Sequence, residues 1–320
     1  MLTSYLTNSA APQKWQPGAA PVAAGDLAWL DLLDPNEEER RYAESMLGAK
    51  LPARDQISAI ELSSRLRSDR QVLRLNIPGF VRAEGGQGAL TPLGFVVSPN
   101  LLVSVRYADS IAFTHVAELA SKDTMPRNSV DTFVGLIEAI ADVGADRMEA
   151  ISSDLSKLSR AVFSDSRDQR RLLRHALFKV GGMQRQITQI RSAMLGLSRV
   201  VSYLCEVSPP WFGTGHHGRL KTVQTDVTSL SEFDQQMNDR LQFLLDAVLG
   251  FINNDQNDIM KVLTVFSVVT IPPMILAGIW GMNFKSIGEY DWPHGYAFAL
   301  TMIVISVIVP LVIFKWKKWF

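Results

Sequence analysis

The feature that most constrains this chain is a pair of long uncharged segments near its C-terminal end. Residues 262–284 contain no Lys, Arg, Asp or Glu, and residues 292–314 contain none either, so each run is 23 residues long. About 20 apolar residues are enough for a helix to cross the hydrocarbon core of a bilayer. The sequence therefore predicts a membrane protein with two C-terminal transmembrane helices, at about 262–284 and 292–314.

The charges around these spans predict their orientation. Lys261 precedes the first span and the lysine-rich tail 315–318 follows the second, whereas the link between them carries Lys285 against Glu289 and Asp291. Because basic residues are retained on the cytoplasmic side of a membrane, we expect both termini in the cytoplasm. The link should then face the outside.

A polar stripe runs along the helix that leads into the first span. Its members are alternately three and four residues apart, which is the 3.5-residue period of helices packed side by side. The stripe comprises Asp246, Gly250, Asn253, Asn257, Met260, Thr264, Ser267, Ile271, Met274, Gly278 and Gly281. Small and uncharged polar residues prevail in it, which favours contact with water or ions and a pore built from several copies of this helix. Such residues also simply join membrane helices, so the stripe alone leaves both interpretations open.

The stripe has the chemistry to pass a hydrated divalent cation. Mg²⁺ sheds its waters reluctantly, and conduction requires binding that is weak enough to release the ion. Uncharged oxygen donors meet that requirement, and the stripe supplies them at Asn253, Asn257, Thr264 and Ser267. Its large apolar members predict constrictions that gate by dewetting, at Met260, Ile271 and Met274.

The first part of the chain predicts an α/β domain. Alternating or apolar runs predict strands at 28–32, 72–77, 93–98 and 101–106, the last two as a hairpin. Residues 1 to about 25 predict a loose start. Asp34 as N-cap and Pro35 at the first helical position predict a helix to about 47, and a second helix is expected from about 53 to 61.

From about residue 129 the apolar spacing changes to that of helices. It predicts a hairpin of two long helices, ending near 162 and 206. A third helix from about His217 to Met282 would be about 100 Å long, with Pro272–Pro273 loosening its membrane part. We therefore expect a cytoplasmic α/β domain at 1–125, a hairpin and stalk at 126–260, and a transmembrane pore domain at 261–320.

Composition excludes several function classes. The 32 basic and 32 acidic side chains cancel, and no basic block with interleaved aromatic residues suggests nucleic acid. Cys205 is the single cysteine, which favours a packed thiol in a reducing compartment. His216 and His217 suggest a solvated loop rather than a metal site. No set of nucleophile, base and orienting group indicates an enzyme.

Several segments together resemble the CorA-type magnesium and cobalt transporters. They are Met260-Lys261-Val262-Leu263-Thr264, Pro272-Pro273, Gly281-Met282-Asn283-Phe284 and the basic-aromatic end 315–320. The Gly-Met-Asn tripeptide stands where that family has its signature, at the outer end of the first of two terminal spans. Trp29-Leu30-Asp31-Leu32, followed by Asp34-Pro35 and acids, is similar to the family's opening.

The resemblance implies a funnel-shaped homopentamer in the cell inner membrane, with stalk helices along the axis. Gly281, Met282 and Asn283 would form the outer selectivity filter, where Asn283 contacts the hydrated ion. Asn257, Met260 and Asp246 match inner pore positions. Mg²⁺ would be both the substrate, entering passively with Co²⁺ or Ni²⁺ tolerated, and the regulatory ligand that closes the pore from the cytoplasm. Asp226 and Asp246 would be its cytoplasmic sites, and no further cofactor is implied.

The outer loop departs from the family pattern. It contains Ile287-Gly288-Glu289-Tyr290 where the family's common loop has Met-Pro-Glu-Leu, and Lys285 stands where many relatives have Glu. Glu289 and Asp291 keep acids that would attract cations. Because a related branch moves zinc, a zinc-transporting sibling is one alternative. A membrane-anchored coiled-coil scaffold without transport is the alternative of another class.

Overall fold

The computed structural model divides the chain into two compact units. One contains Met1–Arg167 and Arg174–Leu244, and the other contains Asp168–Leu173 and Leu245–Phe320. The residues described are 1–9, 11–16, 24–58, 66–68, 71–81, 89–122, 128–164, 169–207, 209–282, 292–317 and 319.

The first unit contains a mixed sheet of seven strands in the order β2-β1-β3-β7-β6-β5-β4. The strands are β1 (Leu2–Leu6), β2 (Gln13–Lys14), β3 (Leu27–Leu33), β4 (Leu66–Ser68), β5 (Leu73–Phe80), β6 (Leu90–Val97) and β7 (Leu102–Arg106). Only β3 and β7 pair in parallel, and the other neighbours are antiparallel. The predicted strands at 28–32, 72–77, 93–98 and 101–106 are confirmed as β3, β5, β6 and β7, and β6 and β7 are adjacent antiparallel partners.

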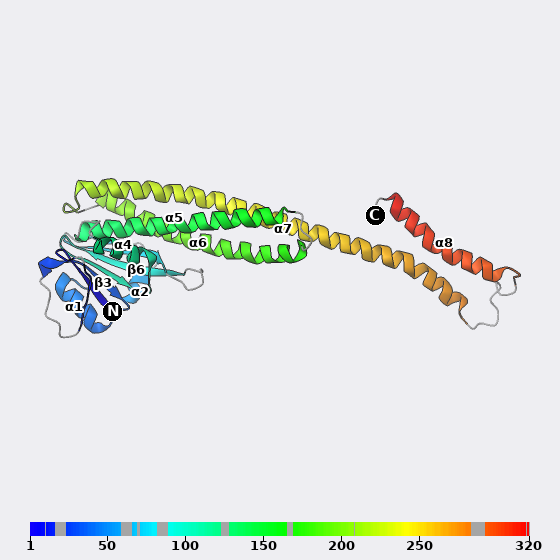
Figure 1. Cartoon of the computed structure of the whole chain (residues 1–320), viewed down its shortest axis with the longest axis horizontal. Helices are drawn as coiled ribbons and strands as arrows, with labels where there is room; N and C mark the ends of the chain where they lie inside the picture. Colours follow the sequence, from blue (N-terminus) through cyan, green and yellow to red (C-terminus); the bar gives the residue numbers. More distant parts are fainter. Residues whose placement is uncertain are drawn as a thin grey trace. The chain divides into compact units, whose positions relative to one another are not determined.

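Helices cover both faces of the sheet (Figure 1). On one face α1 (Glu37–Leu47) and α2 (Arg54–Ser58) contribute Ala43 and Ile57 to a core with Leu30, Leu32 and Val103. On the other face, α4 (Ile111–Ser121) and α5 (Ser129–Val162) bring aromatic rings against the sheet. There the Phe113 and Phe133 rings lie 6.0 and 5.6 Å from the Phe95 ring. Successive side chains along each strand therefore pack alternately into two cores, one on each face of the sheet.

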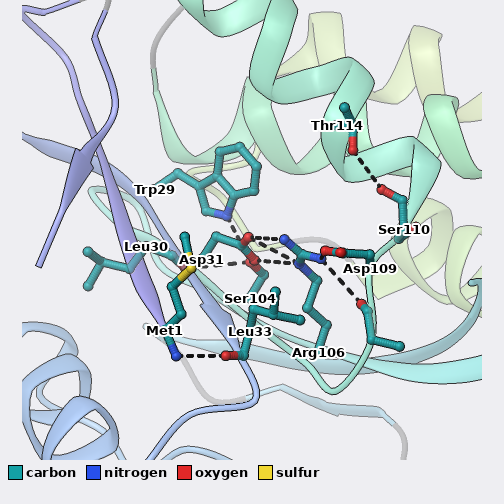
Figure 2. A network of polar contacts seen from close by, with 11 residues as sticks. Met1, Trp29, Leu30, Asp31, Leu33, Ser104, Arg106, Asp109, Ser110 and Thr114 are labelled. Carbon is teal, nitrogen blue, oxygen red and sulfur yellow. Dashed lines mark hydrogen bonds and ion pairs between the residues drawn. The ribbon is translucent and has the colours of Figure 1, made fainter. Parts of the chain in front are cut away.

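A buried polar network joins β3 to β7 on the face that α4 covers (Figure 2). Asp31, 4 % exposed, accepts hydrogen bonds from the Ser104 hydroxyl at 2.8 Å and from Arg106 Nη2 at 2.8 Å. The Trp29 indole N–H donates to Ser104 at 2.8 Å. The Arg106 guanidinium also lies over the Phe113 ring, 5.0 Å from its centroid. Every charged member therefore has a partner, as a buried ion pair requires.

Two predictions for this unit were wrong, and one helix was not predicted. The first residues form β1, which pairs with β3 and buries Leu2 at 1 % exposure. The side chain that caps α1 is Asn36, which forms a capping box with Glu39, whereas Asp34 takes a left-handed conformation at φ 44°. Asn36 is the cap because its side-chain Oδ1 accepts a hydrogen bond from the Glu39 backbone N–H at 2.8 Å. Helix α4 was not predicted, because its short apolar sequence carries no clear helical period.

The predicted helical hairpin is confirmed by α5 and α6 (Gln169–Val207). The apolar or small residues spaced three or four apart along α5 form its packing face, and all of them are buried: Phe133, Ile137, Ile140, Gly144, Met148, Ile151, Leu155, Leu158 and Val162. The third long helix, α7 (Thr214–Trp280), begins earlier than predicted and continues through Pro272 and Pro273. Polar contacts connect it to α6, among them the ion pair between Arg191 and Asp234 at 2.5 Å.

The prediction of a solvated loop at His216 and His217 was wrong, because both residues lie in α7, which begins at Thr214. His216 lies in the first turn of α7, and its Nε2 is 3.1 Å from Asp131 of α5. Arg219 donates to the same carboxylate at 2.8 Å and binds Glu138 through two further hydrogen bonds. The two α5 carboxylates hold this turn in the helix, and His216 is part of that contact instead of a solvated loop.

The second unit contains the end of α7 and α8 (Gly295–Trp316). Both helices have segments long and apolar enough to cross a membrane. In the most apolar stretch of α7, no residue is buried against the described part of the chain. The rings of Trp280 and Trp292 lie 6.5 and 5.7 Å from the Phe298 ring.

Candidate ion pathway

The polar stripe lies on the solvent-accessible surface of the second unit. Asn253, Asn257 and Gly278 are exposed, and Thr264 and Ser267 are partly exposed. The large apolar members are exposed as well: Met260 by 53 %, Ile271 by 46 % and Met274 by 61 %. No described part of this chain buries the stripe. Helix contacts within the described part of one chain therefore do not explain why these residue types occur in the stripe.

Both hydroxyl groups of the stripe donate to the backbone of their own helix. Thr264 Oγ1 donates to the Met260 carbonyl at 2.7 Å, and Ser267 Oγ donates to the Leu263 carbonyl at 2.9 Å. A hydroxyl has one hydrogen and two lone pairs, so each oxygen is left as an acceptor. An acceptor suits the outward-pointing hydrogens of the water shell around a cation.

Polar and apolar positions alternate in zones along the helix. Asn253 and Asn257 come first, then Met260, then the two hydroxyl groups, then Ile271 and Met274. The separation of Met260 and Ile271 is 11 residues, or about 16 Å along a helix. An ion passing along this surface would meet two acceptor zones that alternate with two apolar zones.

The outer end of α7 is set by a glycine. The Gly281 N–H donates to the Ala277 carbonyl at 2.9 Å, and the Met282 N–H donates to the Ile279 carbonyl at 3.3 Å. A Cβ added to Gly281 would lie 3.1 Å from the Ala277 oxygen, whereas one added to Gly278 would have no neighbour within 4 Å. Local backbone crowding thus explains Gly281, and nothing in the described chain explains Gly278.

The remaining residues of the predicted outer mouth fall outside the described residues. These are Asn283, Glu289 and Asp291. Among the described residues, a cavity of about 510 Å³ lies between the end of α7 and the start of α8. It is lined mainly by aromatic and small residues, including Trp280, Trp292 and Tyr296.

The two predicted cytoplasmic sensor residues are both exposed but far apart on α7. Asp226 and Asp246 are separated by 20 residues, or about 30 Å along the helix, so they cannot share an ion. Among the described residues, no group of three or more His, Cys, Asp or Glu side chains is arranged to hold a metal ion.

Asp226 lies close enough to Asp142 of α5 for their charges to interact, which was not predicted from the sequence. Burial raises the pKa of the Asp142 carboxyl, and the nearby charges of Asp146, Glu138 and Asp226 raise that pKa further, against a lowering by His115. The proximity of Asp142 to Asp226 depends on how α5 and α7 pack, which no local pattern predicts.

Comparisons with known proteins agree on one family. The family model described as CorA-like Mg²⁺ transporter protein matches residues 24–318. The magnesium transport protein CorA of Salmonella typhimurium is 28 % identical over 299 residues, covering 92 % of each chain.

Two solved structures show the same fold. The complete structure of the CorA magnesium transporter from Methanocaldococcus jannaschii superposes with a TM-score of 0.75 at 17 % identity, covering 100 % of this chain and 99 % of that one. The ZntB cytoplasmic domain from Vibrio parahaemolyticus superposes with a TM-score of 0.60 at 14 % identity, covering 79 % of this chain and 98 % of that one.

Proposed function

This chain belongs to the CorA-like Mg²⁺ transporter family, and from that premise we propose that it forms a pore through which Mg²⁺ enters the cell passively. The family is one of transporters, so the activity is ion transport rather than catalysis. An inside-negative membrane potential supplies the driving force, about 2.3 kcal/mol per charge per 100 mV, or twice that for a divalent ion.

The observation that carries this proposal is the accessible stripe of α7 with its acceptor oxygens. Thr264 and Ser267 have their hydrogens engaged with the helix backbone, so they present oxygen to an ion's hydration shell. Without a fixed negative charge these oxygens hold the hydrated ion only weakly, as conduction requires. Met260, Ile271 and Met274 supply the apolar constrictions that close the pathway when it loses water.

A pore needs several copies of the stripe around one axis, and a homopentamer is the assembly that we propose. Gly278 supports close helix approach, since a Cβ added there would meet no atom of the described residues within 4 Å. In this arrangement Gly281, Met282 and Asn283 form the outer filter, and Glu289 and Asp291 attract cations to it. Asp246, Asn253 and Asn257 line the inner mouth, with both termini in the cytoplasm of the inner membrane.

Regulation by cytoplasmic Mg²⁺ is part of the proposal. Among the described residues no group of three His, Cys, Asp or Glu side chains could hold a metal ion, and we place the regulatory Mg²⁺ sites at Asp226 and Asp246 between subunits. Asp226→Asn should relieve inhibition of transport by internal Mg²⁺. If the variant is inhibited at the same internal Mg²⁺ concentrations as the wild type, Asp226 is not part of the sensor.

Purified protein in liposomes that contain a Mg²⁺ or Zn²⁺ dye tests the function directly. We expect Mg²⁺ and Co²⁺ influx that grows with an inside-negative potential, and Asn283→Ala should abolish or deregulate it while the assembly stays intact. Influx of Zn²⁺ without Mg²⁺ would identify a zinc-transporting sibling. Influx of neither ion would favour a membrane-anchored scaffold.

A further inference from the structure

The basic first turn of α6 lies beside the part of α7 that leads into the membrane. Arg170 forms an ion pair with Asp255, with its Nε 2.6 Å from Oδ2 and its Nη2 donating to Oδ1 at 3.0 Å. The segment Asp168–Leu173 accordingly belongs to the same compact unit as Leu245–Phe320. These contacts link two positions 85 residues apart in the sequence.

The helix geometry of α7 gives the depth of this contact. Val262 begins the uncharged run and follows Asp255 by seven residues, or about 10 Å along the helix. The headgroup layer extends about 5–8 Å beyond the hydrocarbon core on each side, and the Debye length is about 8 Å at physiological ionic strength. An arginine paired with Asp255 therefore lies within electrostatic reach of lipid phosphates.

Charge and exposure suit this turn to an anionic surface. The Arg170 side chain is 65 % exposed, and Arg171 is exposed as well. Helix α6 as a whole carries seven Lys and Arg residues and one acid, Glu206. On the neighbouring stretch of α7, Asp255 is 38 % exposed and Asp258 pairs with Lys261 at 2.8 Å. Asp165 and Asp168, which precede this turn in the sequence, lie outside the described residues.

The ion pair with Asp255 does not prevent a second partner. An exposed pair of this kind contributes little to stability. A phosphate accepts two parallel N–H bonds from a guanidinium as a carboxylate does. A lipid phosphate can therefore share or replace Asp255 as the partner of Arg170.

We propose that Arg170 and Arg171 bind the headgroups of anionic phospholipids in the leaflet next to the start of the first span. The inference rests on the proposed function only in that α7 enters the membrane near Val262. It does not require that Mg²⁺ passes through the protein. The bound headgroup tethers the first turn of α6 to the membrane surface.

Native mass spectrometry of the detergent-released full chain, titrated with phosphatidylglycerol or phosphatidylcholine, tests the proposal. A basic residue near an anionic surface is worth about fivefold in binding. The double variant Arg170→Gln/Arg171→Gln should therefore weaken phosphatidylglycerol binding at least about fivefold and leave phosphatidylcholine binding unchanged. Unchanged phosphatidylglycerol binding would overturn the proposal.

A matched control removes the same charge from exposed positions of the same helix. Arg185 and Arg199 lie 15 and 29 residues after Arg170, or about 22 and 43 Å along α6. The double variant Arg185→Gln/Arg199→Gln should bind phosphatidylglycerol as the wild type does. An equal loss in the two double variants would show only a general effect of charge and would overturn the proposal.

A third variant separates lipid binding from a structural role of the ion pair. Asp255→Asn frees Arg170 from its carboxylate and should strengthen phosphatidylglycerol binding. If Arg170 acted only by holding α6 to α7, Asp255→Asn would weaken binding as Arg170→Gln does, and the proposal would fail. Mg²⁺ influx is measured separately in liposomes, so a wild-type protein that prefers phosphatidylglycerol but passes no Mg²⁺ would overturn the transport function and support the lipid site.

Discussion

The hydroxyl of Thr264 offers a test of the pathway in which folding and transport are separable. Thr264→Val keeps the branched shape of the side chain and removes its oxygen. That hydroxyl donates only to the Met260 carbonyl of its own helix, at 2.7 Å. Such a bond back to the helix contributes little stability, so the variant should fold and assemble normally.

The expected loss of transport follows from one missing acceptor per subunit. A hydrogen bond to the ion's water shell has a net value of about 0.5–1.5 kcal/mol. At about 1.4 kcal/mol for each factor of ten in rate, the loss of one such bond in the rate-limiting position slows Mg²⁺ influx about two- to thirteenfold. Loss from several subunits at once would slow it more.

The second span supplies a matched control. Thr301 of α8 donates to the Ala297 carbonyl, also at 2.7 Å, but it lies outside the stripe. Both variants are reconstituted in liposomes with a Mg²⁺ dye and an inside-negative K⁺ diffusion potential. Thr264→Val should slow influx, Thr264→Ser should restore it, and Thr301→Val should leave it unchanged. Wild-type influx in Thr264→Val, or equal losses at the two positions, would refute the reasoning.

Three further predictions concern the first unit, which contains the sheet. Asp31→Ala leaves the Arg106 guanidinium, 12 % exposed, without its buried partner and should destabilise the fold by about 3–5 kcal/mol, seen as a lower thermal midpoint in detergent. Burial and the charge of Glu206 raise the pKa of the Cys205 thiol, so iodoacetamide should label it more slowly at pH 8 than a free thiol, with the rate still rising above pH 9. Gly196→Ala should cost about 1–3 kcal/mol despite its better helix propensity, because the new Cβ would overlap the Pro78 ring; a rise in the thermal midpoint would contradict this.

Local patterns in the sequence were sufficient for most of the elements. The strands β5, β6 and β7, the long helices and the two apolar spans follow from hydrophobic periods and lengths, which depend on each residue's own contact with solvent. The order of polar and apolar zones on α7 was also readable, because a single helix fixes which residues share a face. The tripeptide that led to the family could be read without any fold, although its Asn283 lies outside the described residues.

Three features could not be predicted from local sequence patterns, each for a physical reason. Strand β1 has only five residues and is stabilised mainly by its pairing with β3, so its own composition resembles a loose terminus. The start of α1 depended on which of two competing polar side chains reached a backbone amide. The first turn of α7 depended on two carboxylates of α5, which lie more than 80 residues earlier.

The sequence by itself determined that two helices can span a membrane and that one of them carries a stripe of acceptor oxygens. Tertiary structure decided what the distant parts do for one another. It placed Asp31 beside Ser104 and Arg106 across the parallel strands, Asp226 near Asp142 of α5, and Arg170 beside Asp255. These contacts join chemically compatible groups far apart in the chain, and no local period encodes them, because they form only where packed elements bring the groups within hydrogen-bonding distance.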